Sequence, residues 1–198
     1  MSPTRKIILA SSSPRRRELL SGLDVPFTVD TLNSFEEGPM DFDEPSEVPL
    51  ALAQGKSHGF HRPLQKDEIL IAADTVVILR PDSSGGKARV LGKPRDREDA
   101  VRMLRELSGK VHEVVTAVVL RDPSREQSFS EKTLVSFRNL SDAEIDYYVD
   151  RYKPYDKAGS YGVQEWIGYV AIDRIEGSFY NVMGFPVHKV YELLSSWE

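Results

Sequence analysis

The hydrophobic positions of this chain fall into short apolar runs and amphipathic repeats that follow one another along the sequence. Apolar or alternating runs predict strands over residues 6–10, 69–79, 88–91, 111–121, 129–137, 168–172 and 174–180. Turn residues at 81–86 and 122–124 each separate two of these runs, which predicts two antiparallel hairpins. The remaining strands are separated by helical patterns.

Capping residues mark where the predicted helices begin. Ser13 followed by Pro14 predicts one start, Asp96 predicts a second, and Ser141 with Glu144 three residues later forms a capping box. The predicted helices cover residues 14–22, 48–61, 96–109, 141–152 and 186–197. Because strands and helices interleave while hairpins also occur, we expect a mixed α/β fold in which helices flank a sheet bent into two lobes.

Composition narrows the class of protein. A length of 198 residues indicates a single domain spanning 1–198, and 26 basic against 31 acidic residues give a net charge of −5, which argues against nucleic-acid binding and a polybasic membrane anchor. Without cysteine, disulfides and cysteine-ligated metals are excluded. No apolar run approaches the ~18 residues of a membrane span. The first residues also lack a signal-peptide core, so we expect a cytoplasmic protein.

The serine-rich turn before the first helix is a candidate phosphate site. Ser11, Arg15 and Arg16 lie where a strand feeds a helix N-terminus, and free backbone N–H groups there attract anions. Arginines in a first helical turn oppose the helix dipole unless an anion is bound. The alternative is a capped surface helix with solvated arginines.

Asp74 is the sharpest single signal, because it is a carboxylate inside an otherwise apolar strand. Burial of a carboxylate is costly unless it is paired, hydrogen-bonded or bound to a metal. A site at a strand end, where Asp74 holds Mg²⁺ or activates water, would explain it. An aspartate satisfied by backbone donors at a bulge is the alternative.

Other polar residues are candidates on weaker grounds. The acidic loop residues Glu36 and Glu37 can supply a second metal ligand or simply face solvent, and Lys56 and Lys93 can contact phosphate or be solvated. The loop 156–164 carries two glycines that allow close approach to a ligand, and it ends in a glutamine whose amide can read a nucleobase. A long polar connection is the competing interpretation.

Five segments occur in an order that is more specific than any one of them: ASSSPRRRELL, AADTVV, LGKPRD, LSGKVHEVVTAV and DKAGSYGVQ. Together they resemble the Maf family of nucleoside triphosphate pyrophosphatases, from Lys6 almost to the C-terminus. The resemblance implies an elongated α/β fold related to inosine triphosphate pyrophosphatases, with a cleft between two lobes. It also implies cleavage of a nucleoside triphosphate to monophosphate and pyrophosphate with Mg²⁺ or Mn²⁺ as cofactor.

The resemblance assigns roles residue by residue. Asp74 matches the catalytic acid, and Asp74 with Glu37, or its neighbour Glu36, matches the metal-holding acids. The substrate-binding positions are matched by Ser11, Arg15, Arg16, Lys56, Thr75, Lys93 and Gln164.

The segment DKAGSYGVQ resembles the branch of the family that acts on dTTP and UTP. Glu165 and Trp166 follow it where relatives often carry small residues, a departure that bears on base selectivity or on acceptance of modified pyrimidines. The expected partner is a nucleotide, and the sequence leaves open whether the chain forms a homodimer. Two alternatives to this reading are a non-catalytic nucleotide-binding regulator of cell division and a purine-directed pyrophosphatase.

Overall fold

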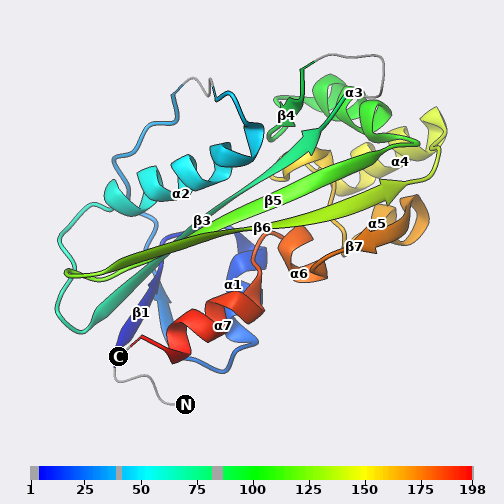
Figure 1. Cartoon of the computed structure of the whole chain (residues 1–198). Helices are drawn as coiled ribbons and strands as arrows, with labels where there is room; N and C mark the ends of the chain where they lie inside the picture. Colours follow the sequence, from blue (N-terminus) through cyan, green and yellow to red (C-terminus); the bar gives the residue numbers. More distant parts are fainter. Residues whose placement is uncertain (1–4, 39–41, 82–86, 198) are drawn as a thin grey trace. The chain divides into compact units, whose positions relative to one another are not determined.

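The computed structural model describes residues 5–38, 42–81 and 87–197. Within these ranges seven strands form one sheet in the order β2-β1-β3-β5-β6-β7, with β4 paired to β3 (Figure 1). The strands are β1 Lys6–Leu9, β2 Phe27–Val29, β3 Glu68–Leu79, β4 Arg89–Leu91, β5 Val111–Arg121, β6 Glu126–Phe137 and β7 Ile172–Glu176. The helices are α1 Pro14–Ser21, α2 Val48–His58, α3 Arg97–Leu107, α4 Asp142–Tyr152, α5 Trp166–Ala171, α6 Phe179–Val182 and α7 Val187–Ser195, with 3₁₀ turns at Pro45–Glu47 and Ala158–Ser160. This is the expected mixed α/β class.

The chain divides into two compact units. Unit 1 is built from the segment up to Asp74, from residues 116–131 and from the segment after Met183, and unit 2 is built from residues 75–115 and 132–183. Strands β3, β5 and β6 each pass from one unit to the other. The cleft that the sequence suggested stays a prediction.

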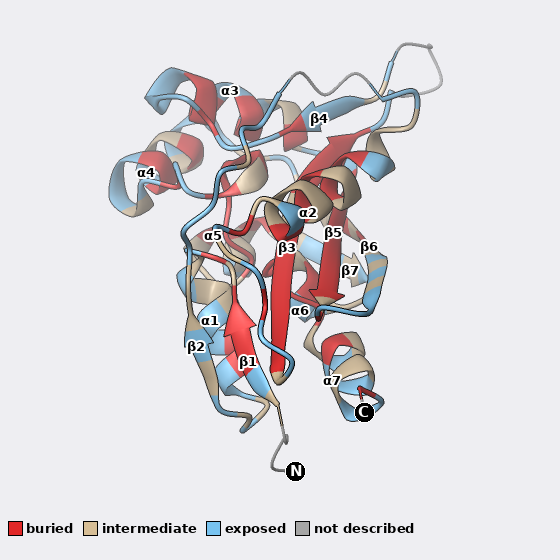
Figure 2. Cartoon of the chain, turned by 90° about the vertical axis from the view of Figure 1, so that its left-hand side faces the viewer, coloured by how far each residue is buried: buried red, intermediate tan, exposed pale blue. Residues whose placement is uncertain are grey.

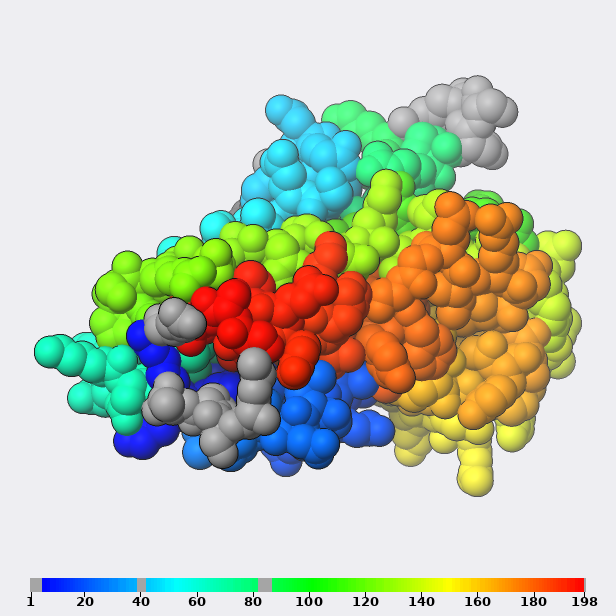
Figure 3. Space-filling view, turned by 60° about the horizontal axis from the view of Figure 1, so that its bottom comes forward, coloured from blue at the N-terminus to red at the C-terminus, as the bar shows by residue number. Residues whose placement is uncertain are grey.

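Unit 1 is organised around three parallel strands. β1 pairs with β2 on one side and with β3 on the other, and Ile7 lies opposite Phe27 and Ile69. β3 is buried along almost all of its length (Figure 2), as a strand covered on both faces should be. Helix α2 lies on one face of this sheet, and α1 and α7 lie on the other (Figure 1), with α7 at the molecular surface (Figure 3).

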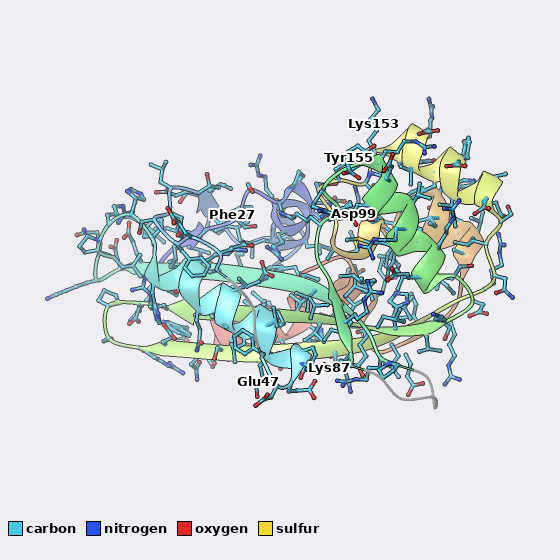
Figure 4. The ribbon with its side chains drawn as sticks, turned by 90° about the horizontal axis from the view of Figure 1, so that it is seen from above. Phe27, Glu47, Lys87, Asp99, Lys153 and Tyr155 are labelled. Carbon is cyan, nitrogen blue, oxygen red and sulfur yellow. The ribbon has the colours of Figure 1, made fainter. Side chains whose placement is uncertain are left out.

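Unit 2 is organised around antiparallel pairs and two packed helices. β3 pairs with β4 through Val77 opposite Leu91, which confirms the predicted hairpin; residues 82–86 at its turn lie outside the described residues. Helix α3 is strongly amphipathic, buries Leu104 and Leu107 and packs against α4. Asp99, labelled in Figure 4, lies in its first turn and accepts hydrogen bonds from the guanidinium of Arg102.

Two sequence-based predictions near the C-terminus are wrong. Residues 166–171 form helix α5 instead of a strand from 168, and the strand predicted over 174–180 ends at Glu176, followed by helix α6. Gly168 shows why: a side chain there would lie 1.8 Å from the carbonyl oxygen of Val163, so this segment folds back tightly on the preceding loop. A short apolar run is compatible with either element by periodicity alone. Strand β2 was not predicted.

A buried carboxylate ties both ends of the described chain to unit 1. Asp122, whose side chain is 3% exposed, accepts hydrogen bonds from the backbone N–H groups of Ser124 (2.7 Å) and Arg125 (2.8 Å). It also accepts from the indole of Trp197 (3.0 Å) and forms an ion pair with Arg5. Burial alone would raise the pKa of Asp122, but these hydrogen bonds outweigh it and the pKa is lowered.

We expect Asp122→Asn to lower the free energy of unfolding at pH 7 by roughly 1–3 kcal/mol, because buried donors lose a charged acceptor. The lowered folded-state pKa means that the carboxylate stabilises the protein fully above about pH 4, its unfolded range, and progressively less as the pH falls below it. The difference between the two proteins should therefore shrink on acidification, as measured by urea unfolding at pH 7 and pH 3.

Asp67→Asn is the matched control, since Asp67 pairs with Lys6 at 2.9 Å while both side chains are largely exposed. Such surface pairs contribute about 0–1 kcal/mol. Equal effects of the two substitutions would contradict the role given to Asp122.

Candidate functional site

The serine-rich turn begins helix α1 as predicted. Ser13 caps the helix, and its hydroxyl accepts a hydrogen bond from the backbone N–H of Arg16 at 3.4 Å, while Pro14 occupies the first helical position. Ser11 is 8% exposed, and its hydroxyl accepts from the backbone N–H of Ser13 at 3.3 Å. The turn is therefore held by its own serines.

Arg16 connects this turn to the central strand. Its guanidinium donates to Ser11 Oγ (3.3 Å), to the carbonyl of Ala73 (2.8 Å) and to the carbonyl of Gly184 (2.9 Å). Loss of solvent around the guanidinium lowers the pKa of Arg16, and the nearby carboxylate of Asp74 raises it in part. Arg16 thus places positive charge beside Asp74 while fixing the backbone on which Asp74 lies.

The central feature of unit 1 is one ammonium shared by two carboxylates. Lys56 on α2 forms ion pairs with Asp74 on β3 and, at 2.8 Å, with Glu37 of the acidic loop. The Asp74 side chain is 14% exposed, that of Lys56 is 26% exposed and that of Glu37 is 50% exposed. The apolar strand therefore satisfies its carboxylate with a charged partner, and the described ion pair involves Glu37 instead of Glu36.

Glu37 reaches Lys56 because the loop before it is docked on α2. The ring of Phe35 occupies the space that a side chain at Gly55 would fill, and its Cβ and backbone nitrogen occupy that space at Gly59, with contacts of 2.3–2.8 Å to an added Cβ. The backbone of Ser34 donates to the carbonyl of Gly59 at 2.8 Å. The acidic loop is thus received at Gly55 within helix α2, whose N-cap Glu47 is labelled in Figure 4, and at Gly59, which follows the last residue of the helix.

This arrangement fits a divalent cation that is held partly by its substrate. Asp74 and Glu37 already converge on one cationic group, Lys56 Nζ, so their oxygens approach a common point. Mg²⁺ is commonly bound by one or two carboxylates together with substrate phosphates and water. No cluster of three His, Asp or Glu side chains suited to a metal is found in the part of the chain that the structure describes.

Unit 2 carries the predicted residues Thr75, Lys93 and Gln164. Lys93 is exposed and follows Gly92, whose carbonyl accepts a hydrogen bond from the backbone N–H of Gly159 at 3.0 Å. Gly159 has φ +66°, and a side chain there would lie 2.8 Å from Val77 of β3. The loop 156–164 therefore lies against the Lys93 turn and against β3, and glycine is needed for both its conformation and its close packing. Thr75, half-buried, directly follows Asp74 on β3.

The glutamine at the end of this loop presents a buried acceptor. Gln164 Oε1 is buried and has no hydrogen-bond partner among the described residues. Upstream, the hydroxyl of Tyr161 lies 2.7 Å from Nε2 of His112, and both rings pack edge-on against Phe137. Burial lowers the pKa of His112 to about 3, so the imidazole that anchors Tyr161 is neutral.

The structure thus brings together, within unit 1, five of the predicted residues: Ser11 with Arg16, and Lys56 with Glu37 and Asp74. Arg15 follows Pro14 in the first turn of α1. Thr75, Lys93 and Gln164 belong to unit 2. Sequence reasoning did not single out His112 as a support of this loop, although it stands in the segment LSGKVHEVVTAV, because a lone histidine does not indicate a distant partner such as Tyr161.

No helix in the described ranges is both long and apolar enough to cross a membrane. The chain is 52% identical over 195 residues to a Porphyromonas gingivalis protein named dTTP/UTP pyrophosphatase. The alignment covers 97% of this chain and 94% of that protein. A Parabacteroides distasonis protein of the same name is 48% identical over 189 residues, covering 96% and 94%.

Among solved structures, the Staphylococcus aureus Ham1 protein aligns over 98% of this chain and 100% of its own, with a TM-score of 0.52 and 14% identity, which is a likeness of fold alone. The family model described as Maf-like protein matches residues 6–197. With a family match over nearly all of the chain and close to half of its residues identical to these relatives, the chain belongs to the Maf family.

Proposed function

We propose that this protein hydrolyses dTTP and UTP to the nucleoside monophosphate and pyrophosphate. The observation that carries the proposal is Lys56 between Asp74 and Glu37, with Arg16 beside them. This cluster combines cations suited to phosphate with two carboxylates suited to a divalent cation. The names of the relatives support the same reaction. We place it in the cytoplasm and assign it to a single domain.

The cationic side chains hold the triphosphate. A protein of net charge −5 repels a polyanion unless local positive charge compensates. Arg15, Arg16 and Lys56 supply that charge from unit 1, and Ser11 adds a hydroxyl at the helix N-terminus. In unit 2 we assign phosphate contact to Lys93 and substrate contact to Thr75.

The carboxylates carry the chemistry. When Mg²⁺ or Mn²⁺ is bound, it supplies charge neutralisation at the attacked phosphorus and lowers the pKa of bound water. Asp74 and Glu37 would hold it, and Asp74 also orients the attacking water or accepts its proton. Lys56, relieved of its carboxylate partners, then pairs with phosphate oxygens. No covalent nucleophile is required.

Gln164 recognises the base. A thymine or uracil ring presents an N3–H donor between two carbonyl acceptors. The buried, unpartnered Oε1 of Gln164 can accept from that N–H, while its amide N–H₂ donates to a neighbouring carbonyl. Cytosine has a lone pair at N3, which would face the same oxygen. Hydrogen bonding of this kind favours dTTP and UTP over dCTP by leaving polar groups unpaired in the wrong complex.

The product test decides the reaction. Hydrolysis of dTTP in H₂¹⁸O should yield dTMP and pyrophosphate with the label in dTMP, because the water attacks the α-phosphorus. EDTA should abolish turnover. Mass spectrometry of the products distinguishes this from labelled pyrophosphate, and dTDP with orthophosphate would overturn the proposal.

The same assays separate the two alternative functions. Nucleotide binding without hydrolysis would favour the non-catalytic regulator, and faster turnover of dATP or dGTP would favour a purine-directed enzyme.

Asp74→Asn should lower kcat by roughly 10²–10⁴-fold, the usual worth of a positioned acid–base group. Nucleotide affinity should change less, because Arg16 and Lys56 remain. Single-turnover hydrolysis with saturating Mg²⁺, beside a binding titration, measures both. Asp67→Asn is the control and should retain full activity, because Asp67 directly precedes the same strand but is largely exposed. Full activity in folded Asp74→Asn would move the chemistry to another residue.

Gln164→Ala should reduce the ratio of kcat/KM for dTTP to that for dCTP by roughly tenfold or more, because the wrong base no longer leaves a polar group unpaired. Comparing bases of equal ring size isolates the hydrogen-bond pattern from the size of the site. An unchanged ratio would remove Gln164 from base recognition while leaving the assignment of the phosphate-binding residues intact.

A further inference from the structure

We propose that Glu165 is a positioning residue that fixes the loop 157–164 and thereby sets the base preference assigned to Gln164. The inference rests on the proposed function, because it deepens the role of the same glutamine. Its basis is that one carboxylate oxygen of Glu165 pairs with Lys157 at the start of the loop, while the other accepts from Tyr148, which binds the backbone of Gly162 near its end.

One oxygen holds the beginning of the loop. Lys157 is 8% exposed, and its ammonium lies 3.0 Å from Glu165 Oε1 and 2.8 Å from Asp156 Oδ1. A buried ammonium is costly unless it is paired. Asp156 is half-exposed whereas the Glu165 side chain is 20% exposed, so Glu165 is the better-shielded partner. Removing its charge would leave Lys157 with a solvent-screened partner alone.

The other oxygen holds the end of the loop through a tyrosine. Tyr148 on α4 is fully buried, and its hydroxyl donates to Glu165 Oε2 and accepts from the backbone N–H of Gly162 at 3.0 Å. Burial and the Glu165 carboxylate both raise the pKa of Tyr148, so the hydroxyl stays a donor. Gly162 is thereby tied to helix α4 through Tyr148, and Tyr148 is oriented by Glu165.

The backbone of residues 162–165 also packs on the Glu165 side chain. The N–H of Glu165 donates to the carbonyl of Gly162 at 3.0 Å, and a Cβ on Gly162 would lie 2.9 Å from the Glu165 carboxyl carbon. Residues 162–165 therefore form a tight turn packed on the Glu165 side chain. Glycine at 162 leaves the space that the carboxylate occupies.

Gln164 lies inside this turn. Its acceptor oxygen has no partner among the described residues, so no hydrogen bond at that atom orients it. The placement of the oxygen then depends on the backbone at 162–165, which Glu165 holds. A displacement of about 1 Å is enough to cost up to 10²-fold in a positioned interaction.

The experiment compares Glu165→Ala, Glu165→Gln and Tyr148→Phe with the unmodified enzyme. Glu165→Ala removes both contacts, Glu165→Gln keeps one acceptor oxygen of two, and Tyr148→Phe breaks only the link to Gly162. We expect the dTTP to dCTP ratio of kcat/KM to fall roughly tenfold in Glu165→Ala and by less in the other two, measured well below each melting temperature. Inhibition by pyrophosphate should stay unchanged, since pyrophosphate carries no base.

The matched control is Glu106→Gln. Glu106 is also a glutamate of unit 2, its side chain is 21% exposed and it pairs with two cations, Arg89 and Arg102. A merely structural effect would lower the melting temperature in the Glu165 variants and in Glu106→Gln alike, and would leave the base ratio unchanged in all of them. The proposal therefore expects Glu106→Gln to keep the ratio while the Glu165 variants lose it.

An unchanged ratio in folded Glu165→Ala and Tyr148→Phe would overturn the inference and leave the proposed function standing. If Glu165→Ala does not fold, the other two variants decide. If the unmodified protein hydrolyses no triphosphate, the proposed function is wrong. The dissociation constants of the α,β-imido analogues of dTTP and dCTP then test Glu165 instead, and equal affinities in the unmodified protein would overturn the inference as well.

Discussion

The structure of unit 1 depends on keeping a carboxylate inside an apolar strand. Asp74 lies in β3, whose residues 69–73 and 76–79 are buried, and Lys56 compensates its charge from helix α2. That ion pair requires α2 to lie over β3. The acidic loop must in turn dock on α2 through Phe35, because Glu37 shares the same ammonium. The free-energy cost of burying the Asp74 carboxylate thus accounts for the placement of helix α2 and of the acidic loop.

The same cluster neutralises the charges of its carboxylates when no ligand is bound. Removing a partner from a buried charge is more costly than losing a surface pair. Lys56 occupies the point on which both carboxylates converge, and Arg16 lies beside Asp74, so two positive charges balance two negative charges without a ligand. A nucleotide accompanied by a divalent cation offers an exchange in which each group finds a new partner of opposite charge. Neither partner alone offers that exchange.

Much of the framework follows from local signals. Ser13, Asp96 and Ser141 cap the helices that they predict, and the apolar runs at β3 and β5 become central strands. Asp74 could be singled out because a lone carboxylate in an apolar run has few explanations. The choice of Glu37 over Glu36 could not be made, since it depends on how Phe35 packs against glycines some twenty residues away. Helix α5 was missed because a close backbone approach at Gly168 overrides the apolar pattern.

The Asp122 cluster has a consequence for the order of the chain. Arg5 and Trp197 both bond to Oδ2 of one carboxylate, so the two ends of the described chain meet at a single atom. Chain ends this close can be joined by a short linker, which makes the protein a candidate for circular permutation. The same geometry makes a bulky fusion next to Trp197 or a truncation past Arg5 unfavourable, because either would disturb a buried charge. Affinity tags therefore belong beyond these two residues, on a spacer that leaves the indole and the guanidinium in place.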